Sequence, residues 1–559
     1  MDKTKVLNLK QLIKSSRLSL SNIAPDLLVI CVCLVSLVFS IIESRVNIDA
    51  HHWGFMYANA TQLNQGLIPF KDIFIQYGFL TTWIQAFAMH FLGDTVVAVG
   101  IITGVFYSIN IYLSYCLWQK VLNRWLSAVS ALLMFLVHGY IIYPWSNYIS
   151  YTFLLLALLL IVNSQERKSY YILSGVFFAL NVLARQTSLV PTLIPIELYF
   201  VYSYLISKNE HQLSKKKLIN IAIFNLSIAT IFIVFYLYLV RVAALKDWYL
   251  QSVTILDFYE ELLGNRFQLL KSLVKNLIRG LLGVTNFYET RFKYPRLMIY
   301  SFMFLNCIII CARLASKIFR IKPPKNTNIS QSLFLLSSIS LVGYLQSVHI
   351  YEIFRLQSAS SLGIGLTIFS LDRVLKIFGK WKNLFLVVPI VFLTILLCKD
   401  VIFVQNASVY FPWDQKQLIS GELREPQKLR FLQGKLYDFD TITYYETLKD
   451  EIEKYSDQLD YLVNYTPNSY VLFLSDKFRN IQKSPFYNAR LSSLIFSEEE
   501  NKISELFEQK KAILVTSYPE RVPINYCYVH SLVKPIPYIS LPLYVTIPKN
   551  IAKDCKSIP

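Results

Sequence analysis

Apolar residues are concentrated in long stretches through the first 400 residues, with short polar connections between them. About 20 apolar residues in a helix span the hydrocarbon core of a bilayer. The pattern predicts eleven membrane-spanning helices, at residues 25–42, 97–117, 125–142, 150–164, 170–184, 189–206, 218–240, 297–315, 329–347, 357–371 and 384–400. A further apolar stretch at 79–92 is short for a span, and we interpret it as a helix that lies on, or dips into, the outer membrane surface.

The polar connections indicate which side of the membrane they face. Cytoplasmic loops of membrane proteins carry an excess of Lys and Arg. With a cytoplasmic N-terminus, every connection on the inner side contains basic residues; these connections are 119–124, 165–169, 207–217, 315–325 and 372–382. The sequence therefore predicts an N-terminus inside the cell, with the loops 43–96 and 241–296 and all residues after 400 outside.

Composition supports a membrane protein and excludes several other classes. The chain has 559 residues, of which 54% are hydrophobic and 16% charged, whereas a soluble domain has about 25% charged residues. The net charge is +19, but residues 401–559 contain 19 basic and 19 acidic residues, so the basic excess lies in residues 1–400. A basic excess between apolar segments is typical of membrane topology, and no nucleic-acid partner is expected.

The composition changes after residue 400, where charged and turn-forming residues become frequent. Residues 470–474 and 512–516 are predicted to form short strands. Residues 498–511 are predicted to form a helix, whose acidic start and basic end suit the helix dipole. The patterns predict two domains, a transmembrane domain at 1–400 and a small extracytoplasmic α/β domain at 401–559.

Two cysteines, Cys527 and Cys555, lie in the C-terminal region. Disulfides form and persist in oxidising compartments outside the cytoplasm. The two thiols could therefore pair if this region is extracytoplasmic, but two cysteines alone do not establish a pairing.

Asp49 is the first candidate for chemistry, because it directly follows the first predicted span. Ionisable groups near the membrane are costly to bury and tend to be functional. A partly desolvated carboxylate suits a general base. Asp is also a favoured N-cap residue, so Asp49 either acts as a base or caps the helix that follows it.

Other charged residues share the loop with Asp49. Glu43 lies at the edge of the first span with Arg45 nearby, and we interpret it as an interface anchor. Lys71 and Asp72 lie farther along the loop. Asp72 is expected to orient Lys71 or the neighbouring backbone, because it lies in a Pro-aromatic-Lys-Asp turn.

His51 and His52 come directly after Asp49. Neighbouring positions of a helix face different directions, so a metal ion shared by the two histidines is not expected. The two side chains either form hydrogen bonds to a substrate or pack at the interface beside Trp53. No cofactor is indicated, and the sequence carries no motif that points to a divalent metal.

The first outer loop as a whole resembles that of the GT-C superfamily of integral-membrane glycosyltransferases. The resemblance is carried by the acid after the first span, the Gly-x-x-Pro-aromatic-basic-Asp segment at Gly66–Asp72, and the Tyr-Gly pair at Tyr77–Gly78. This superfamily includes the protein O-mannosyltransferases and the bacterial aminoarabinose transferases. The resemblance covers most of the chain and implies a GT-C-like, polytopic α-helical fold in a bacterial plasma (inner) membrane.

The resemblance also implies a reaction and its partners. The donor is a polyprenyl-phosphate-linked sugar, transfer occurs on the outer face with inversion at the anomeric carbon, and Asp49 corresponds to the catalytic base. The partners are the lipid-linked donor, membrane lipid, and a glycan, lipid or protein acceptor. Many members carry two neighbouring acids in this loop, whereas Asp49 is followed by Ala50, so a paired-acid or metal role does not carry over.

Transfer from a lipid phosphate requires cations that stabilise the leaving phosphate. Basic residues on the predicted outer side are candidates for this role, and polar neighbours are candidates for binding the substrate. The complete set is His51, His52, Lys71, Asp72, Tyr77, Arg185, Gln186, His349 and Arg355. Arg suits planar, bidentate contact with phosphate, although Arg185 and Arg355 could instead extend along the membrane edge.

These observations predict an inverting glycosyltransferase that moves a sugar from a polyprenyl-phosphate-linked donor to a hydroxyl acceptor. Two alternatives stay open. A glycan polymerase or ligase also uses lipid-linked sugars, but its large functional loop usually lies between late spans. A transporter or flippase of lipid-linked substrates tends to show inverted repeats and broken helices near the midplane. We find no internal repeat in this sequence, and we expect no acid in the middle of a span.

Overall fold

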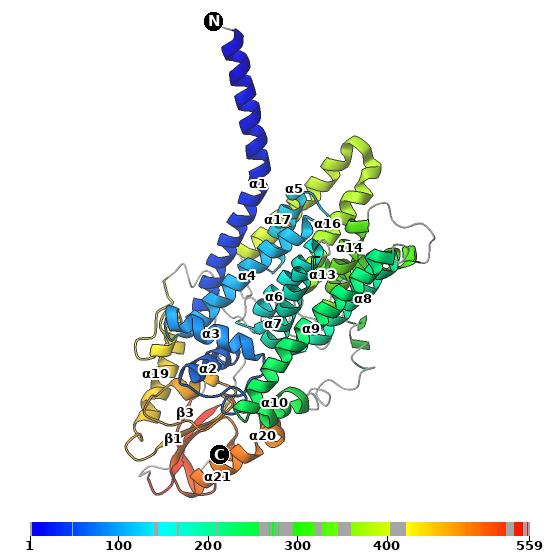
Figure 1. Cartoon of the computed structure of the whole chain (residues 1–559). Helices are drawn as coiled ribbons and strands as arrows, with labels where there is room; N and C mark the ends of the chain where they lie inside the picture. Colours follow the sequence, from blue (N-terminus) through cyan, green and yellow to red (C-terminus); the bar gives the residue numbers. More distant parts are fainter. Residues whose placement is uncertain are drawn as a thin grey trace.

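The computed structural model describes residues 3–46, 49–138, 144–164, 167–207, 211–255, 294–318, 327–344, 359–402, 421–532 and 542–551, with single positions between 268 and 278 and at 556. Long helices form a bundle, and a smaller region that contains the described strands lies at one end of it (Figure 1). The N-terminal part of α1 extends beyond the bundle at the opposite end (Figure 1).

Every predicted span falls at least in part on a helix of the bundle. These helices are α1 (Lys3–Val46), α4 (Val96–Trp118), α5 (Arg124–His138), α6 (Ser146–Asn163), α7 (Lys168–Ala184), α8 (Leu189–Ser207), α9 (His211–Arg241), α13 (Tyr294–Ile318), α14 (Thr327–Gly343), α16 (Gly363–Val374) and α17 (Lys382–Ile402). Within the described residues, seven helical stretches are long and apolar enough to cross a membrane, while the apolar helices at α5, α7 and α14 are shorter. The chain is therefore a multi-pass membrane protein, and the count of eleven spans stays a prediction.

Small residues allow α1 and α4 to pack closely. A Cβ atom added at Gly100 would lie 2.3 Å from the Cβ of Ser44, and one added at Gly104 would lie 2.3 Å from the Cβ of Ser40. Small residues at such contacts are typical of helices packed in membranes. The contact fixes the end of α1, where the loop 43–96 begins. We call this loop and the loop 241–296 the outer loops, after the side of the membrane predicted for them.

The first outer loop contains two helices, α2 (His52–Asn64) and α3 (Phe79–Leu92). α3 has the bounds of the short apolar stretch predicted to be a helix. Its side chains Trp83, Phe87 and Phe91 are 45%, 67% and 69% exposed, and their spacing of four residues places them on one face. This aromatic stripe favours the predicted position at the membrane surface.

Four strands of the C-terminal region form one mixed sheet in the order β1-β2-β4-β3. β1 (Tyr461–Tyr465) is parallel to β2 (Ala512–Thr516), whereas β4 (Leu543–Pro548) is antiparallel to both β2 and β3 (Tyr526–Leu532). β2 and β4 are buried along their whole length, as expected of central strands. The strand predicted at 512–516 is confirmed.

Three helices accompany the sheet: α19 (Phe439–Glu453), α20 (Ala489–Ile495) and α21 (Ser497–Glu508). The predicted helix at 498–511 corresponds to α21, which ends earlier. The strand predicted at 470–474 is wrong, because these residues fall in a 3₁₀ helix, η7 (Ser469–Phe473). The Asn468 side chain accepts a hydrogen bond from the Tyr470 N–H, and such a local bond favours a turn over an extended strand.

The cysteines of the helical bundle that the structure describes are all free. Cys527, in β3, is disulfide-bonded. Cys555, which was considered as its partner, lies outside the described residues.

An acid in the middle of α8 contradicts the expectation that no predicted span contains one. Glu197 belongs to α8 and interacts with Asn225 of α9. Ionisable residues within spans are rare and usually face other protein groups. The hydropathy pattern overlooks this residue, because a single acid hardly changes the mean over a long apolar window.

The C-terminal region is tied to both large outer loops. Lys483 Nζ lies 3.0 Å from Asp247 Oδ1 in α10 (Leu245–Tyr249). The Lys483 carbonyl oxygen accepts a hydrogen bond of 3.0 Å from the N–H of Phe74 in the first outer loop. Beside these contacts, Glu499 Oε2 accepts a hydrogen bond of 2.9 Å from the Lys483 N–H.

Glu499 gives this junction a dependence on pH. Burial raises the pKa of Glu499 to about 7, from an ordinary value of 4.5. The folded state thus binds the proton more tightly, so the stabilisation is complete below about pH 4.5 and is lost as the pH rises through 7. We expect Glu499→Gln to be more stable than the wild type by about 1–3 kcal/mol at pH 8 and nearly equal to it at pH 4.5. Unfolding of both proteins in one detergent measures the difference, and equal stability at pH 8 would contradict the assignment.

Candidate active site

Asp49 lies between α1 and α2 and uses both carboxylate oxygens. Oδ1 accepts hydrogen bonds from the backbone N–H groups of His51 and His52, at 2.8 and 3.1 Å. Oδ2 lies 2.7 Å from His52 Nδ1. The Asp49 side chain is 12% exposed. One oxygen therefore caps the start of α2, as the structural interpretation expects, while the other lies beside an imidazole that can orient it.

The two histidines have different surroundings. His51 Nδ1 lies 3.0 Å from the carbonyl oxygen of Pro467, and its ring contacts Phe486 edge-on at 4.6 Å. Burial, with a smaller contribution from His52, lowers the pKa of His51 to about 4, so this imidazole is neutral at pH 7. The His52 ring instead contacts Trp145 edge-on at 5.3 Å. His51 thus packs against the C-terminal region, and His52 is the histidine directed to Asp49.

Tyr77 lies on the same side of the site as His52. Its ring stacks on Trp145 with a centroid distance of 6.2 Å, and the same indole contacts His52. Trp145 precedes α6, so a bundle helix and the first outer loop meet at this point. The structure therefore brings His52 and Tyr77 together at Trp145, with Asp49 held beside His52.

Asp72 closes the turn that contains Lys71. Asp72 Oδ2 accepts a hydrogen bond of 2.9 Å from the Ile68 N–H, and the Asp72 N–H donates to the Ile68 carbonyl oxygen at 2.8 Å. Gln251 holds the same turn, since its Nε2 donates to the Phe70 carbonyl oxygen at 2.6 Å. Asp72 therefore orients the neighbouring backbone. Asp49, in contrast, is the acid of this loop that lies beside His52.

Arg185 follows the last residue of α7 and lies next to the first outer loop. Its Nε donates to Thr187 Oγ1 at 3.0 Å, and Gln186 begins the 3₁₀ helix η1 (Gln186–Ser188). Gly78 packs directly against this segment, because a Cβ atom there would lie 2.0 Å from the Ala184 carbonyl oxygen. The fold thereby connects Arg185 with the loop that carries Asp49. His349 and Arg355 lie outside the described residues.

One charged residue of this site, Lys435, is overlooked by the sequence analysis, and another, Glu43, is assigned a different role by it. Lys435 is 0% exposed, and its Nζ lies 4.6 Å from the centre of the Trp53 ring and 5.8 Å from that of Tyr437. Burial lowers the pKa of Lys435 to about 7, against the opposing influence of Glu43 and Asp49. Glu43 is 1% exposed, so its interpretation as an interface anchor is wrong.

Backbone contacts hold Lys435 in place at the end of α1. The Leu436 N–H donates to the Arg45 carbonyl oxygen at 2.7 Å, and Arg45 Nε donates to the Gly434 carbonyl oxygen at 3.0 Å. The Gly434 N–H in turn donates to Glu425 Oε1 at 2.7 Å. The chain after residue 421 therefore completes a site that the first outer loop begins.

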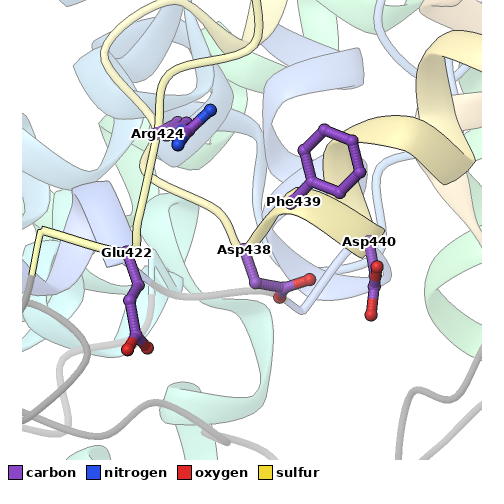
Figure 2. Close-up of a pocket in the computed structure, with 5 residues that line it drawn as sticks. All are labelled: Glu422, Arg424, Asp438, Phe439 and Asp440. Atoms are coloured by element: carbon purple, nitrogen blue, oxygen red, sulfur yellow. The ribbon is translucent and has the colours of Figure 1, made fainter.

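A groove of about 330 Å³ lies farther along this segment, lined by Glu422, Arg424, Asp438, Phe439 and Asp440. Figure 2 shows the Asp438 side chain between those of Glu422 and Asp440, while Arg424 points away from these carboxylates. Asp438 caps α19 by accepting a hydrogen bond from the Thr441 N–H at 2.7 Å. None of the residues predicted from the sequence lines this groove.

Within the part of the chain that the structure describes, no group of three or more His, Cys, Asp or Glu side chains could hold a metal ion. The arrangement around Asp49 offers a carboxylate, the imidazole of His52 and the buried cation Lys435 as its chemical groups. Such a set can accept a proton from a hydroxyl group and stabilise negative charge.

No protein-family model and no curated protein matches the sequence. Among solved structures, ArnT from Cupriavidus metallidurans bound to undecaprenyl phosphate is similar, with a TM-score of 0.50, 10% identity, and coverage of 95% of this chain and 99% of that chain. The oligosaccharyltransferase AglB from Archaeoglobus fulgidus, in complex with an inhibitory peptide and a dolichol-phosphate, gives a TM-score of 0.48 and 12% identity over 89% of this chain and 70% of that chain. At this identity, the similarity to ArnT shows the fold alone.

Proposed function

We propose that this chain, which has the GT-C fold, transfers a sugar from a polyprenyl-phosphate-linked donor to a hydroxyl group of an acceptor on the outer face of the membrane. The observation that carries the proposal is the position of Asp49 at the end of α1, with one oxygen held by backbone N–H groups and the other beside His52. The undecaprenyl phosphate bound to ArnT supports a polyprenyl carrier for the donor.

In the proposed reaction, Asp49 accepts the proton of the acceptor hydroxyl group. The acceptor oxygen then forms a bond to the anomeric carbon, while the bond from that carbon to the phosphate oxygen breaks and its electron pair leaves with the phosphate. Attack from the face opposite the phosphate inverts the anomeric carbon. A general base acts at about 2.6–3.2 Å from the hydroxyl oxygen, and His52 orients the Asp49 carboxylate for this contact.

Arg185 is the described cation best suited to the leaving phosphate. Its guanidinium group can form planar, bidentate contacts with phosphate oxygens, and its backbone is joined to the first outer loop through the Gly78–Ala184 contact. Arg355 is proposed for the same role from the sequence. Both arginines lie on the side that the proposed topology places outside the cell, where basic residues are otherwise disfavoured.

Replacing Arg185 by Ala is expected to weaken donor binding by about 10–150-fold, because a hydrogen bond to a charged group contributes roughly 1.5–3 kcal/mol. Binding of undecaprenyl phosphate to the purified protein in nanodiscs measures this loss. Arg167→Ala is a matched control, since Arg167 caps the other end of α7. Unchanged affinity in Arg185→Ala would remove this residue from the donor site.

The transfer itself can be tested with defined donors. Purified protein in nanodiscs is given undecaprenyl phosphate carrying mannose, glucose or aminoarabinose in turn, together with membrane-extracted acceptors, and the release of undecaprenyl phosphate is followed. The proposal predicts release from at least one donor by the wild type and its loss in Asp49→Asn. Equal rates in the two proteins would contradict the proposed chemistry.

A further inference from the structure

We propose that Lys435 is a positioning residue for the reaction, whose buried ammonium group balances the two acids Glu43 and Asp49 and so keeps Asp49 ionised. This inference rests on the proposed function, because it assigns Lys435 a role through the proposed base. It also assigns the chain after residue 421 a part in the chemistry, rather than a role in packing alone.

The first support is the burial of opposite charges in one place. Lys435 is 0% exposed and Glu43 is 1% exposed, and a buried charge is strongly unfavourable unless an opposite charge compensates it. Lys435 interacts electrostatically with Glu43 from α1 and with Asp49 from the first outer loop. The Trp53 ring face, 4.6 Å from Nζ, adds a favourable cation–π contact.

The second support is the rigidity of this placement. The backbone on both sides of Lys435 is bonded to Arg45, through Gly434 and Leu436. The backbone of Lys435 is therefore fixed at the junction between α1 and the C-terminal region, and its side chain is buried there. On its own segment, the Tyr437 ring lies 5.8 Å from Nζ, and Glu425 accepts a hydrogen bond from the N–H of the preceding residue, Gly434.

The charges of these three side chains predict the effect of removing the lysine. Below about pH 7, where Lys435 is protonated, Glu43, Asp49 and Lys435 carry one net negative charge. His52, 2.7 Å from Asp49 Oδ2, is common to all the variants. Without the lysine, two carboxylates remain in a buried site, and like charges in such a site raise the pKa of one of them. The proton that is taken up is shared between Glu43 and Asp49, and Asp49 cannot act as a base while it carries this proton. The loss is therefore expected in kcat, with binding of the donor retained.

The test compares Lys435→Met, Glu43→Gln and the double variant, using the undecaprenyl-phosphate sugar that the wild type consumes. In Lys435→Met, the acidic limb of the pH profile of kcat is expected to move up by about one pH unit, with about a tenfold loss of rate below that limb. The double variant again carries one net negative charge, so most of the lost rate should return. Binding of undecaprenyl phosphate should be unchanged in all three variants.

Lys217→Met is the matched control, because Lys217 is also a buried lysine, but its Nζ donates to the Ser203 carbonyl oxygen at 3.0 Å in a contact between α9 and α8. It should leave the pH profile unchanged. If Lys435→Met does not fold, Glu43→Gln alone tests the inference, because the acidic limb of its pH profile of kcat should move to lower pH.

Two results would overturn the inference: an unmoved acidic limb in both single variants, or a double variant no faster than Lys435→Met. Asp49→Asn, measured alongside, separates this failure from that of the proposed function. If Asp49→Asn loses rate while the acidic limbs of the pH profiles of Lys435→Met and Glu43→Gln do not move, only the role of Lys435 is rejected. Full rate in Asp49→Asn rejects the proposed function itself.

Discussion

Asp49→Asn is expected to lower turnover by about 10²–10⁴-fold, which is the usual contribution of a general base. Asn keeps the size and the hydrogen-bonding oxygen of Asp, so the contact that caps α2 through the His51 and His52 N–H groups can persist. The substitution therefore removes the basicity of the side chain and keeps its size and its hydrogen-bond acceptor. Release of undecaprenyl phosphate by the purified variant measures the loss, and donor binding should be largely retained.

Asp72→Asn is the matched control, because it makes the same chemical change in the same loop. Asp72 accepts its hydrogen bond from the Ile68 N–H, and an Asn oxygen can accept that bond as well. The loss of rate should therefore be much smaller than in Asp49→Asn. If Asp49→Asn turns over at the wild-type rate, Asp49 is only a helix cap.

Gly78→Ala is expected to have the second large effect, on the folded state as well as on activity. Gly78 has a φ of +137°, a region that residues with a Cβ rarely adopt. The added Cβ would also lie 2.0 Å from the Ala184 carbonyl oxygen, and overpacking of this kind costs about 1–3 kcal/mol or more. The first loop must then move away from Arg185, so we expect a lower yield of folded protein and loss of turnover in the remainder.

Gly93→Ala separates the cost of the positive φ from the cost of the close contact of the added Cβ. Gly93 also has a positive φ, of +96°, but nothing lies within 4 Å of an added Cβ. It should show only the smaller cost of the backbone conformation. Thermal unfolding of both variants in one detergent measures the difference, and equal melting temperatures would show that the close contact at Gly78 is unimportant.

The helical part of the fold was predictable because hydropathy is a local property. Runs of apolar residues locate a helix wherever they occur, and α3 has the predicted bounds. The same averaging conceals single polar residues, which is why Glu197 inside α8 escaped notice. The number of helices that cross the membrane depends on tilt and on neighbours, so hydropathy alone does not determine it.

Only the candidate-site residues that lie close together in the sequence were predictable. Asp49, His52 and Tyr77 lie in one loop with a recognisable pattern, and the structure places His52 and Tyr77 at Trp145, with Asp49 beside His52. Lys435 is nearly 400 positions farther along the chain and follows an unremarkable turn. Its contact with the end of α1 depends on how the C-terminal region docks, and no local pattern encodes that docking.

The C-terminal region shows the same division between local and long-range information. The strand at Ala512–Thr516 is continuously apolar and was predicted with its observed bounds. The apolar residues from Tyr470 gave the same signal, yet they form η7, because the Asn468 side chain begins a turn there. A short apolar run is compatible with either structure, and the capping side chain decides between them.

Mass spectrometry of cell-envelope glycans and glycoproteins tests the central claim most directly. Cells that carry the wild-type gene are compared with cells that lack it and with cells that carry Asp49→Asn. The proposed transfer predicts that the mass of one sugar is lost from a specific envelope component in both altered strains, while a polyprenyl-phosphate-linked sugar accumulates. Identical envelope glycans and lipid-linked sugars in all three strains would contradict a glycosyltransferase that depends on Asp49.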